Sequence, residues 1–301
     1  NTVLGETALD ASVTGANNTA IGKNALTANT SGAENVAVGV SGLAANTTGG
    51  DNVAIGVEAL FTSTTGSDNV AVGKAALKLA TTASKNTAVG NAALASNTTG
   101  FDNVAVGDLA LDANTTGNQN TAVGQECMTT NTTGVNNSAF GHRAAKLTTS
   151  GSSLVAIGQS ALEENTAGTA NVAVGVQALE GNLTADNNTA VGNAALKENT
   201  TGASNTALGS LALDANTTGD DNTALGKGAL GANTTASFNT AVGVDALRDN
   251  TTGAGNVCMG VNAGLTATGG SNVAIGNNTF RGSSNSASNC TAVGDNALNA
   301  N

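Results

Sequence analysis

Apolar and polar positions recur along the whole chain with a period of 17 residues. Asn103 opens the stretch NVAVGDLALDANTTGNQ, and Asn120 opens NTAVGQECMTTNTTGVN. We number the positions of each repeat as slots one to seventeen, with the consensus N-[TV]-A-[VIL]-G-x-x-A-L-x-x-N-T-T-G-x-x. A fixed internal period is typical of a repeat architecture, in which each repeat packs mainly on its two neighbours.

Eighteen repeats follow one another over residues 1–301. A repeat of 16 residues (256–271) is followed by one of 18 (272–289), so the register is regained afterwards. The chain stops inside the last repeat, and we expect a single continuous array that is part of a longer fibre. The repeats start at residues 1, 18, 35, 52, 69, 86, 103, 120, 137, 154, 171, 188, 205, 222, 239, 256, 272 and 290.

A repeat of this length predicts one coil of a parallel β-solenoid, because known helical repeats need 30 or more residues. Slots two to four, such as 87–89, are small or β-branched, which favours a short strand. Slots seven to ten, such as 92–95, are expected to form a second short strand. The NTTG segment indicates a turn, since Asn and Gly are common turn residues. We therefore predict an all-β fold of about eighteen stacked coils.

Slot five is glycine in every repeat, which predicts a turn or bend with positive φ at the end of each strand. Only glycine adopts such conformations without steric cost. These structural turn glycines are Gly5, Gly22, Gly39, Gly56, Gly73, Gly90, Gly107, Gly124, Gly141, Gly158, Gly175, Gly192, Gly209, Gly226, Gly243, Gly260, Gly276 and Gly294.

Two pairs of neighbouring slots are apolar at both positions: slots three and four, as in Ala88-Val89, and slots eight and nine, as in Ala93-Leu94. Neighbouring residues of a strand point to opposite faces, so one member of each pair would face water or another chain. A repeated apolar stripe is more than a soluble monomer usually exposes, which predicts a symmetric oligomer. The alternative is that all four slots bend away from strict alternation and share one core.

The segments NTAVG, NVAVG and NVAIG, each followed by Ala-Leu, resemble the head repeats of trimeric autotransporter adhesins, the YadA-like heads. They are equally similar to repeat arrays of bacteriophage tail-fibre-like proteins. The resemblance implies one left-handed parallel β-roll per chain and three chains around an axis, which is a homotrimer. The repeat here is longer than the familiar head repeat and carries an added NTTG-type turn.

Composition and charge mainly exclude functions. The net charge of −11 excludes an electrostatic nucleic-acid binder, which needs a basic surface. No apolar run is long enough for a membrane-spanning helix, which needs about 18 residues. The Gly, Ser, Thr and Asn content is also typical of low-complexity disorder. A disordered chain, however, would not keep apolar slots in register over eighteen repeats.

Few side chains offer catalytic or metal chemistry. The three cysteines, Cys127, Cys258 and Cys290, occupy repeat slots, and we expect small packing residues. A disulfide between symmetry-related chains at one level is the alternative. His142, the only histidine, stands at the variable slot six without other metal-ligating residues around it. We expect no catalytic site, no metal site and no cofactor.

Several acidic residues share slot seventeen, at one edge of the predicted coil. Oxygen ligands gathered in this way attract Ca²⁺, but the spacing of several coils between some of them argues against a built site. We interpret them as a solvated surface that keeps the protein soluble. These residues are Asp51, Asp68, Asp102 and Asp221.

The NTT segments also have the sequence of N-glycosylation sites, N-x-[ST]. Two interpretations stay open: a hydrogen-bonded ladder of turns, or surface acceptors of glycan. Asn114 and Asn216 have an Asp two residues earlier, and Asn182 has Glu180, which bacterial oligosaccharide transfer accepts. The ten candidates are Asn114, Asn216, Asn182, Asn29, Asn46, Asn97, Asn131, Asn199, Asn233 and Asn250.

Taken together, the sequence predicts a non-catalytic structural or adhesive segment of an extracellular fibre, on a cell surface or a virion appendage. It would act as a rigid shaft or as a multivalent adhesin head that binds a host-surface glycan or protein. The alternative is the shaft of a phage tail fibre or tailspike with receptor binding. An ice-binding solenoid is a further alternative, but Thr and Val alternate irregularly at slot two, as in Thr87 and Val104.

Overall fold

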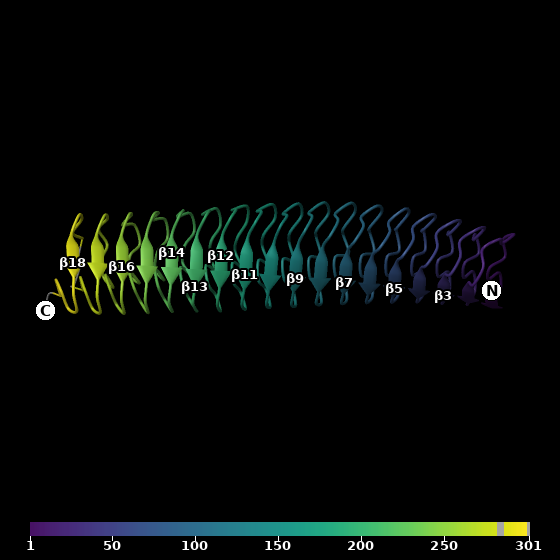
Figure 1. Cartoon of the computed structure of the whole chain (residues 1–301), viewed down its shortest axis with the longest axis horizontal. Helices are drawn as coiled ribbons and strands as arrows, with labels where there is room; N and C mark the ends of the chain where they lie inside the picture. The colour runs from purple at the N-terminus through teal and green to yellow at the C-terminus, as the bar shows by residue number, and fades with distance from the viewer. Residues whose placement is uncertain (282–285, 300–301) are drawn as a thin grey trace. The chain divides into compact units, whose positions relative to one another are not determined.

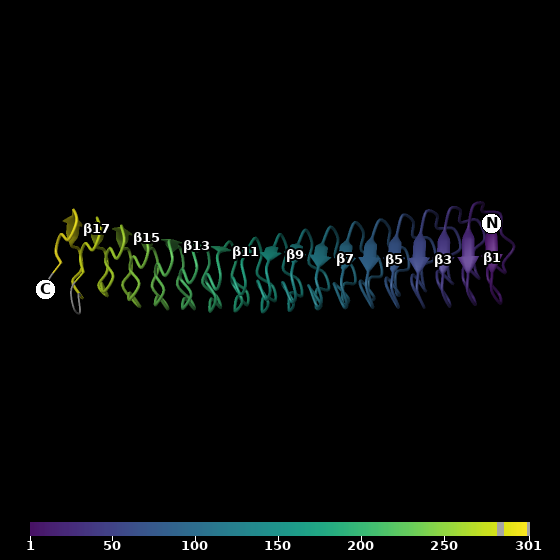
Figure 2. The ribbon, with the colours of Figure 1, turned by 90° about the horizontal axis from the view of Figure 1, so that it is seen from below.

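The computed structural model describes residues 1–281 and 286–299, which form two compact units, Asn1–Ser152 and Ser153–Asn301. Each unit is a stack of coils, and each coil consists of one three-residue strand and a long segment of turns. The strands within a unit lie side by side in chain order (Figure 1). The turn segments run from the end of one strand to the start of the next (Figure 2). The fold is therefore an all-β parallel solenoid.

The strands occupy slots two to four of each repeat, as the sequence predicts. In the first unit they are β1 (Thr2–Leu4), β2 (Thr19–Ile21), β3 (Val36–Val38), β4 (Val53–Ile55), β5 (Val70–Val72), β6 (Thr87–Val89), β7 (Val104–Val106), β8 (Thr121–Val123) and β9 (Ser138–Phe140). In the second they are β10 (Val155–Ile157), β11 (Val172–Val174), β12 (Thr189–Val191), β13 (Thr206–Leu208), β14 (Thr223–Leu225), β15 (Thr240–Val242), β16 (Val257–Met259), β17 (Val273–Ile275) and β18 (Thr291–Val293).

Pairing between neighbouring strands keeps identical slots opposite one another. Val36 of β3 pairs with Val53 of β4, one period further along the chain. The register survives the two repeats of unequal length, because Val257 pairs with Val273 and Val273 pairs with Thr291. The insertion and deletion are thus absorbed in the turn segments and leave the strands aligned.

The core of each coil is narrow and half polar. Inside lie the Ala of slot three, the Ala and Leu of slots eight and nine, the Asn of slots one and twelve, and the small residue of slot fifteen. Leucine is the commonest large residue among them, as in Leu94 and Leu213, which are fully buried, and Met128 and Phe280 replace it at slot nine. The apolar residues of slots eight and nine therefore both face inward. For these two slots the alternative prediction, a shared core, is correct.

The second strand expected at slots seven to ten is wrong, because these slots form turns. Slots seven and nine have positive φ, 53° at both Ala92 and Leu94, whereas slot eight between them does not. An extended strand requires negative φ throughout. The turn residues still bond to neighbouring coils, since the Ala92 N–H donates to the Lys74 carbonyl and the Leu94 N–H to that of Ala110.

Glycine at slot five has the positive φ that the sequence predicts, between 121° and 147° at all eighteen positions. It is also a place where two coils approach each other closely. A Cβ added to Gly192 would lie 2.6 Å from the carbonyl carbon and oxygen of Gly209. Both the backbone conformation and the contact with the next coil therefore require glycine at this slot.

Candidate functional site

The outward side of the strands is the most distinctive surface of both units. In β2 to β18 the slot-three residue points inward and is buried, as Ala88 and Ala105 are, while slots two and four point outward. We call the outward residues of slots two and four the strand face. Because identical slots stay opposite one another, each column of this face stacks the side chains of one slot at about 4.8 Å intervals.

Slot four supplies a column of large apolar side chains that remain in contact with solvent. Phe140, Ile157 and Leu225 are 41%, 42% and 46% exposed, although side chains of this kind are usually inside. The column consists of Leu4, Ile21, Val38, Ile55, Val72, Val89, Val106, Val123 and Phe140 in the first unit, and of Ile157, Val174, Val191, Leu208, Leu225, Val242, Met259, Ile275 and Val293 in the second.

No charged residue lies on the strand face. The chain has ten Lys and Arg and 21 Asp and Glu, and none of them stands at slots one to five of any repeat. They stand at slots six, seven, ten, eleven, sixteen and seventeen instead. Surfaces that stay in water normally mix both signs of charge among their residues. A charge-free column of Val, Ile and Leu is therefore the kind of surface that another protein chain covers.

Ion pairs between coils are found instead on the surface formed by slots six to eleven, which we call the turn side. Glu126 accepts from Lys146 at 2.7 Å and from Arg143 at 3.2 Å, both in the next coil. The hydrogen bond from Lys146 is the main cause that lowers the pKa of the Glu126 carboxyl. Lys78 pairs in the same way with Glu58 at 2.8 Å. The charges thus tie neighbouring coils together and leave the strand face free of them.

The asparagines of the NTT segments do not face solvent, which argues against the interpretation as surface acceptors. All ten candidates are fully buried: Asn29, Asn46, Asn97, Asn114, Asn131, Asn182, Asn199, Asn216, Asn233 and Asn250. The amide nitrogen that would carry a glycan is hydrogen-bonded inside the solenoid, to its own coil and to the preceding one. In Asn114 it donates to Asn97 Oδ1 at 2.8 Å and to the Gly117 carbonyl at 3.0 Å.

These asparagines form one of two amide ladders inside the solenoid. At slot one, the backbone N–H and the Nδ2 of Asn35 both donate to Asn18 Oδ1 in the preceding coil. At slot twelve, Asn46 Nδ2 donates to Asn29 Oδ1. The two ladders meet at slot fifteen, where the Gly49 carbonyl accepts from both Asn35 and Asn46. The turn ladder, the other interpretation of the NTT segments, is what the structure contains.

The slot-twelve ladder is interrupted wherever another residue replaces asparagine. Ser63 and Ala80 separate Asn46 from the next asparagine, Asn97. At this break the buried Asn46 Oδ1 has no hydrogen-bond partner among the described residues. The breaks after Asn46 and Asn131 each leave one buried carbonyl oxygen unsatisfied, which costs free energy of folding, whereas Asn250 Oδ1 accepts from the Gly253 N–H.

The cysteines and the histidine are not brought together. Cys127 and Cys258 are buried, and burial raises the pKa of each thiol to about 12, so both behave as packing residues. Cys290 is half-buried and free. His142 is exposed at slot six. The disulfide between symmetry-related chains stays untested.

The slot-seventeen aspartates Asp51, Asp68, Asp102 and Asp221 are all exposed. Lys85 stands between Asp68 and Asp102 in this column. Among the described residues no group of three or more His, Cys, Asp or Glu side chains is placed to hold a metal ion. The described residues also include no helix with the length and apolarity that a membrane crossing requires.

Comparison with protein-family models gave no match, and comparison with curated proteins gave none either. The candidate site therefore rests on the residues of this chain: an apolar, charge-free strand face that repeats from coil to coil in each unit.

Proposed function

We propose that this chain is a structural and adhesive segment of an extracellular fibre, in which three copies pack their strand faces against one another. The observation that carries the proposal is the absence of charge from slots one to five, together with the exposed apolar column of slot four. The resemblance to YadA-like heads supports the number three and a left-handed coil.

Self-association gives the strand face a partner of matching chemistry. A second copy presents the same apolar column, and the spacing between coils is identical in both copies. Closed symmetric assemblies are the usual arrangement of homo-oligomers. Burial of the column would add hydrophobic stabilisation of about 25 cal/mol for each Å² of apolar surface.

Sedimentation equilibrium tests this proposal on the complete chain. We expect three times the mass of the chain over a range of concentrations. A stable monomer would contradict self-association, and a stable dimer would contradict the threefold assembly while keeping the strand face as its interface.

Adhesion would come from repetition of weak contacts, because linked sites raise the effective concentration at a surface. Deletion of two, four or eight complete repeats tests this part. We expect binding to a target surface to weaken step by step while the fold is kept, because solenoid stability sums over neighbouring repeats. Binding that no deletion affects would identify the segment as a spacer, as in the shaft of a phage tail fibre.

An ice-binding role is less well supported. The outward column contains side chains as different in size as Val191 and Phe140. Thr and Val also alternate irregularly beside it, so the face does not present one repeated hydroxyl array. A thermal-hysteresis measurement separates this role from the fibre.

A further inference from the structure

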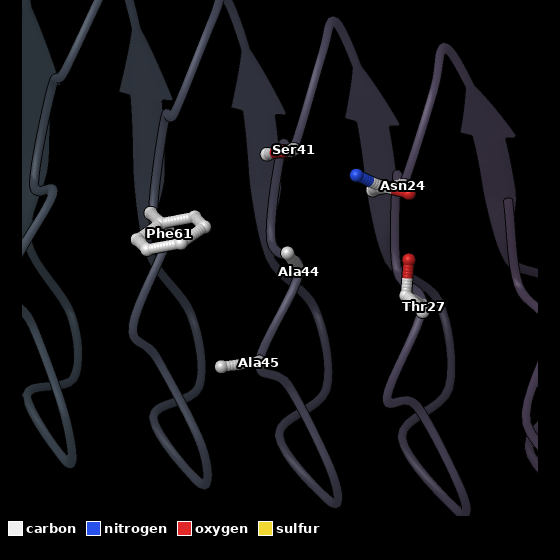
Figure 3. Close-up of a pocket in the computed structure, with 6 residues that line it drawn as sticks. All are labelled: Asn24, Thr27, Ser41, Ala44, Ala45 and Phe61. Atoms are coloured by element: carbon white, nitrogen blue, oxygen red, sulfur yellow. The ribbon is translucent and has the colours of Figure 1, made fainter. Parts of the chain in front are cut away.

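One groove on the turn side differs from the repeating surface of the coils. It spans the second, third and fourth coils of the first unit and is lined by Asn24, Thr27, Ser41, Ala44, Ala45 and Phe61 (Figure 3). Its volume is about 410 Å³, and it is open to solvent. Small-molecule sites commonly have volumes of about 300–1,000 Å³. The groove belongs to slots seven, ten and eleven and is separate from the strand face.

The groove lies where a large side chain follows a coil with small ones. Phe61 is the only aromatic residue at slot ten in the whole chain. The preceding coil has alanine at slots ten and eleven, Ala44 and Ala45, which leaves a hollow beside the ring. Phe61 is half-buried, and Figure 3 shows its ring beside this hollow. One wall of the groove is therefore apolar and partly aromatic.

The opposite wall carries amide and hydroxyl groups. The Thr7 hydroxyl donates to Asn24 Oδ1, and the Thr27 hydroxyl donates to the Thr7 carbonyl at 3.0 Å, which fixes both side chains. Among the described residues, neither Asn24 Nδ2 nor the Ser41 hydroxyl has a hydrogen-bond partner of its own. The groove thus offers an oriented amide donor and a free hydroxyl opposite an aromatic ring.

The charges around the groove are paired. Lys78 binds Glu58 at 2.8 Å beyond Phe61, and Lys23 binds Glu6 at 3.0 Å near Asn24. None of the six lining residues is charged. A charged ligand would lose hydration without gaining an opposite charge, whereas a neutral polar ligand would not.

We propose that this groove binds a neutral hexopyranose, with the apolar face of the sugar on the Phe61 ring and its hydroxyls on Asn24 and Ser41. A sugar ring combines these two surfaces, a face of C–H groups and an edge of hydroxyls, as the groove does. The inference adds a ligand class to the proposed adhesive segment, and it rests on that proposal only in keeping the turn side uncovered in the assembly.

Ligand-observed NMR and titration on the full chain test the inference, with the methyl pyranosides of glucose, galactose and mannose as probes. We expect at least one of them to bind, and Phe61→Ala to weaken that binding at least tenfold. Ala44→Leu, which fills the hollow and keeps the ring, should weaken it as well. Phe101→Ala, at an exposed phenylalanine of slot sixteen in the same unit, is the matched control and should leave binding unchanged.

Absence of binding by all three pyranosides, or equal binding by the Phe61→Ala and wild-type chains, would overturn the inference. Sedimentation of the same samples keeps this result separate from the proposed fibre. A trimer that binds no sugar would contradict only the groove, and a monomer that binds sugar would contradict only the assembly.

Discussion

The buried asparagine is the residue that makes this solenoid possible with so few large side chains. Its carbonyl oxygen accepts from the coil on one side, and its amide nitrogen donates to the coil on the other, as Asn114 does between Asn97 and Asn131. A buried amide without partners costs about 1–3 kcal/mol, so each asparagine depends on the next one. The ends of a ladder are consequently its weak points.

Joining two separate segments of the slot-twelve ladder should stabilise the protein. Ser63→Asn combined with Ala80→Asn would connect Asn46 to Asn97 and give the Asn46 Oδ1 a donor. We expect the double variant to gain about 1–3 kcal/mol in free energy of unfolding, measured by urea denaturation.

The single variants of this pair are the controls. Ser63→Asn alone moves the unpaired acceptor one coil along, and Ala80→Asn alone leaves the Asn46 Oδ1 unpaired, so each should stabilise the protein less than the double variant. Two single effects that add up to the double effect would contradict the ladder, because residues in one network are not additive.

Asp112 is a residue at which stability should depend on pH. Its Oδ1 is buried without a hydrogen-bond partner among the described residues, and burial is the main cause that raises the pKa of this carboxyl. An acid whose pKa is raised on folding stabilises the fold fully below its ordinary pKa, and this contribution is lost as pH rises through the raised value. Asp112→Asn should therefore raise the melting temperature at pH 7, and its advantage should shrink towards pH 4.

Asp10→Asn is the matched control for this prediction, since Asp10 stands at the same slot and is exposed. It should alter the melting temperature little at either pH. If the melting temperature of Asp112→Asn differed from that of wild type by the same amount at every pH, the Asp112 carboxyl would not be the cause of the pH dependence.

The coil, as an element, is one short strand followed by turns in which three side-chain-bearing slots, seven, nine and seventeen, are left-handed. This predicts that at Ala92, whose φ is 53°, a glycine variant is more stable than a valine variant. Ala92→Val should destabilise by about 1–3 kcal/mol, because a β-branched residue is strained there, while Ala92→Gly should be neutral or stabilising. Thermal unfolding of both variants is the measurement.

Slot six provides the comparison, since Gln125 is exposed and lacks positive φ. At this slot, Gln125→Gly should have a melting temperature no higher than that of Gln125→Val. The opposite order at Ala92, with Val favoured over Gly, would be the behaviour of a strand and would contradict the turn.

The sequence predicted the strand and its glycine because both follow from local preferences. Val and Thr favour extended backbone, and Gly39 or Gly56 marks the bend after it. It failed at slots seven and nine, because leucine in a left-handed conformation is not a usual turn signal. The absence of β-branched residues from slot nine, and from slot seven except at Thr7, was the available indication.

The asparagines were misplaced for a different reason. A polar side chain in a turn is normally solvated. It is stable inside the solenoid only when an identical side chain in the next coil supplies its hydrogen-bond partner. Slot twelve contains Asn, Ser, Thr or Ala and never a charged residue, as at Asn46, Ser63 and Ala80. That restriction is the pattern of an interior position. The groove at Phe61 could not be predicted either, since it depends on how side chains of three coils meet.

In the whole molecule, we propose that one surface self-associates and another stays in contact with solvent. The strand face has no charge and carries an apolar column. The surface formed by the NTTG segments, slots twelve to fifteen, which we call the NTTG side, presents hydroxyls such as those of the exposed Thr99 and Thr116. Only the first is a surface that gains from being covered by another copy. The sequence indicated such a stripe, and the structure identifies slot four as its position.

Sedimentation equilibrium of two matched double variants tests whether the strand face is the interface. Val89→Glu with Val106→Glu places two acids on the strand face, and Thr99→Glu with Thr116→Glu places two acids on the NTTG side of the same coils. Because an unpaired charge is costly to bury, the first variant should sediment as a folded monomer, with its circular dichroism unchanged, and the second as a trimer. A trimer in both variants, or a monomer in both, would contradict the assignment of the strand face as the interface.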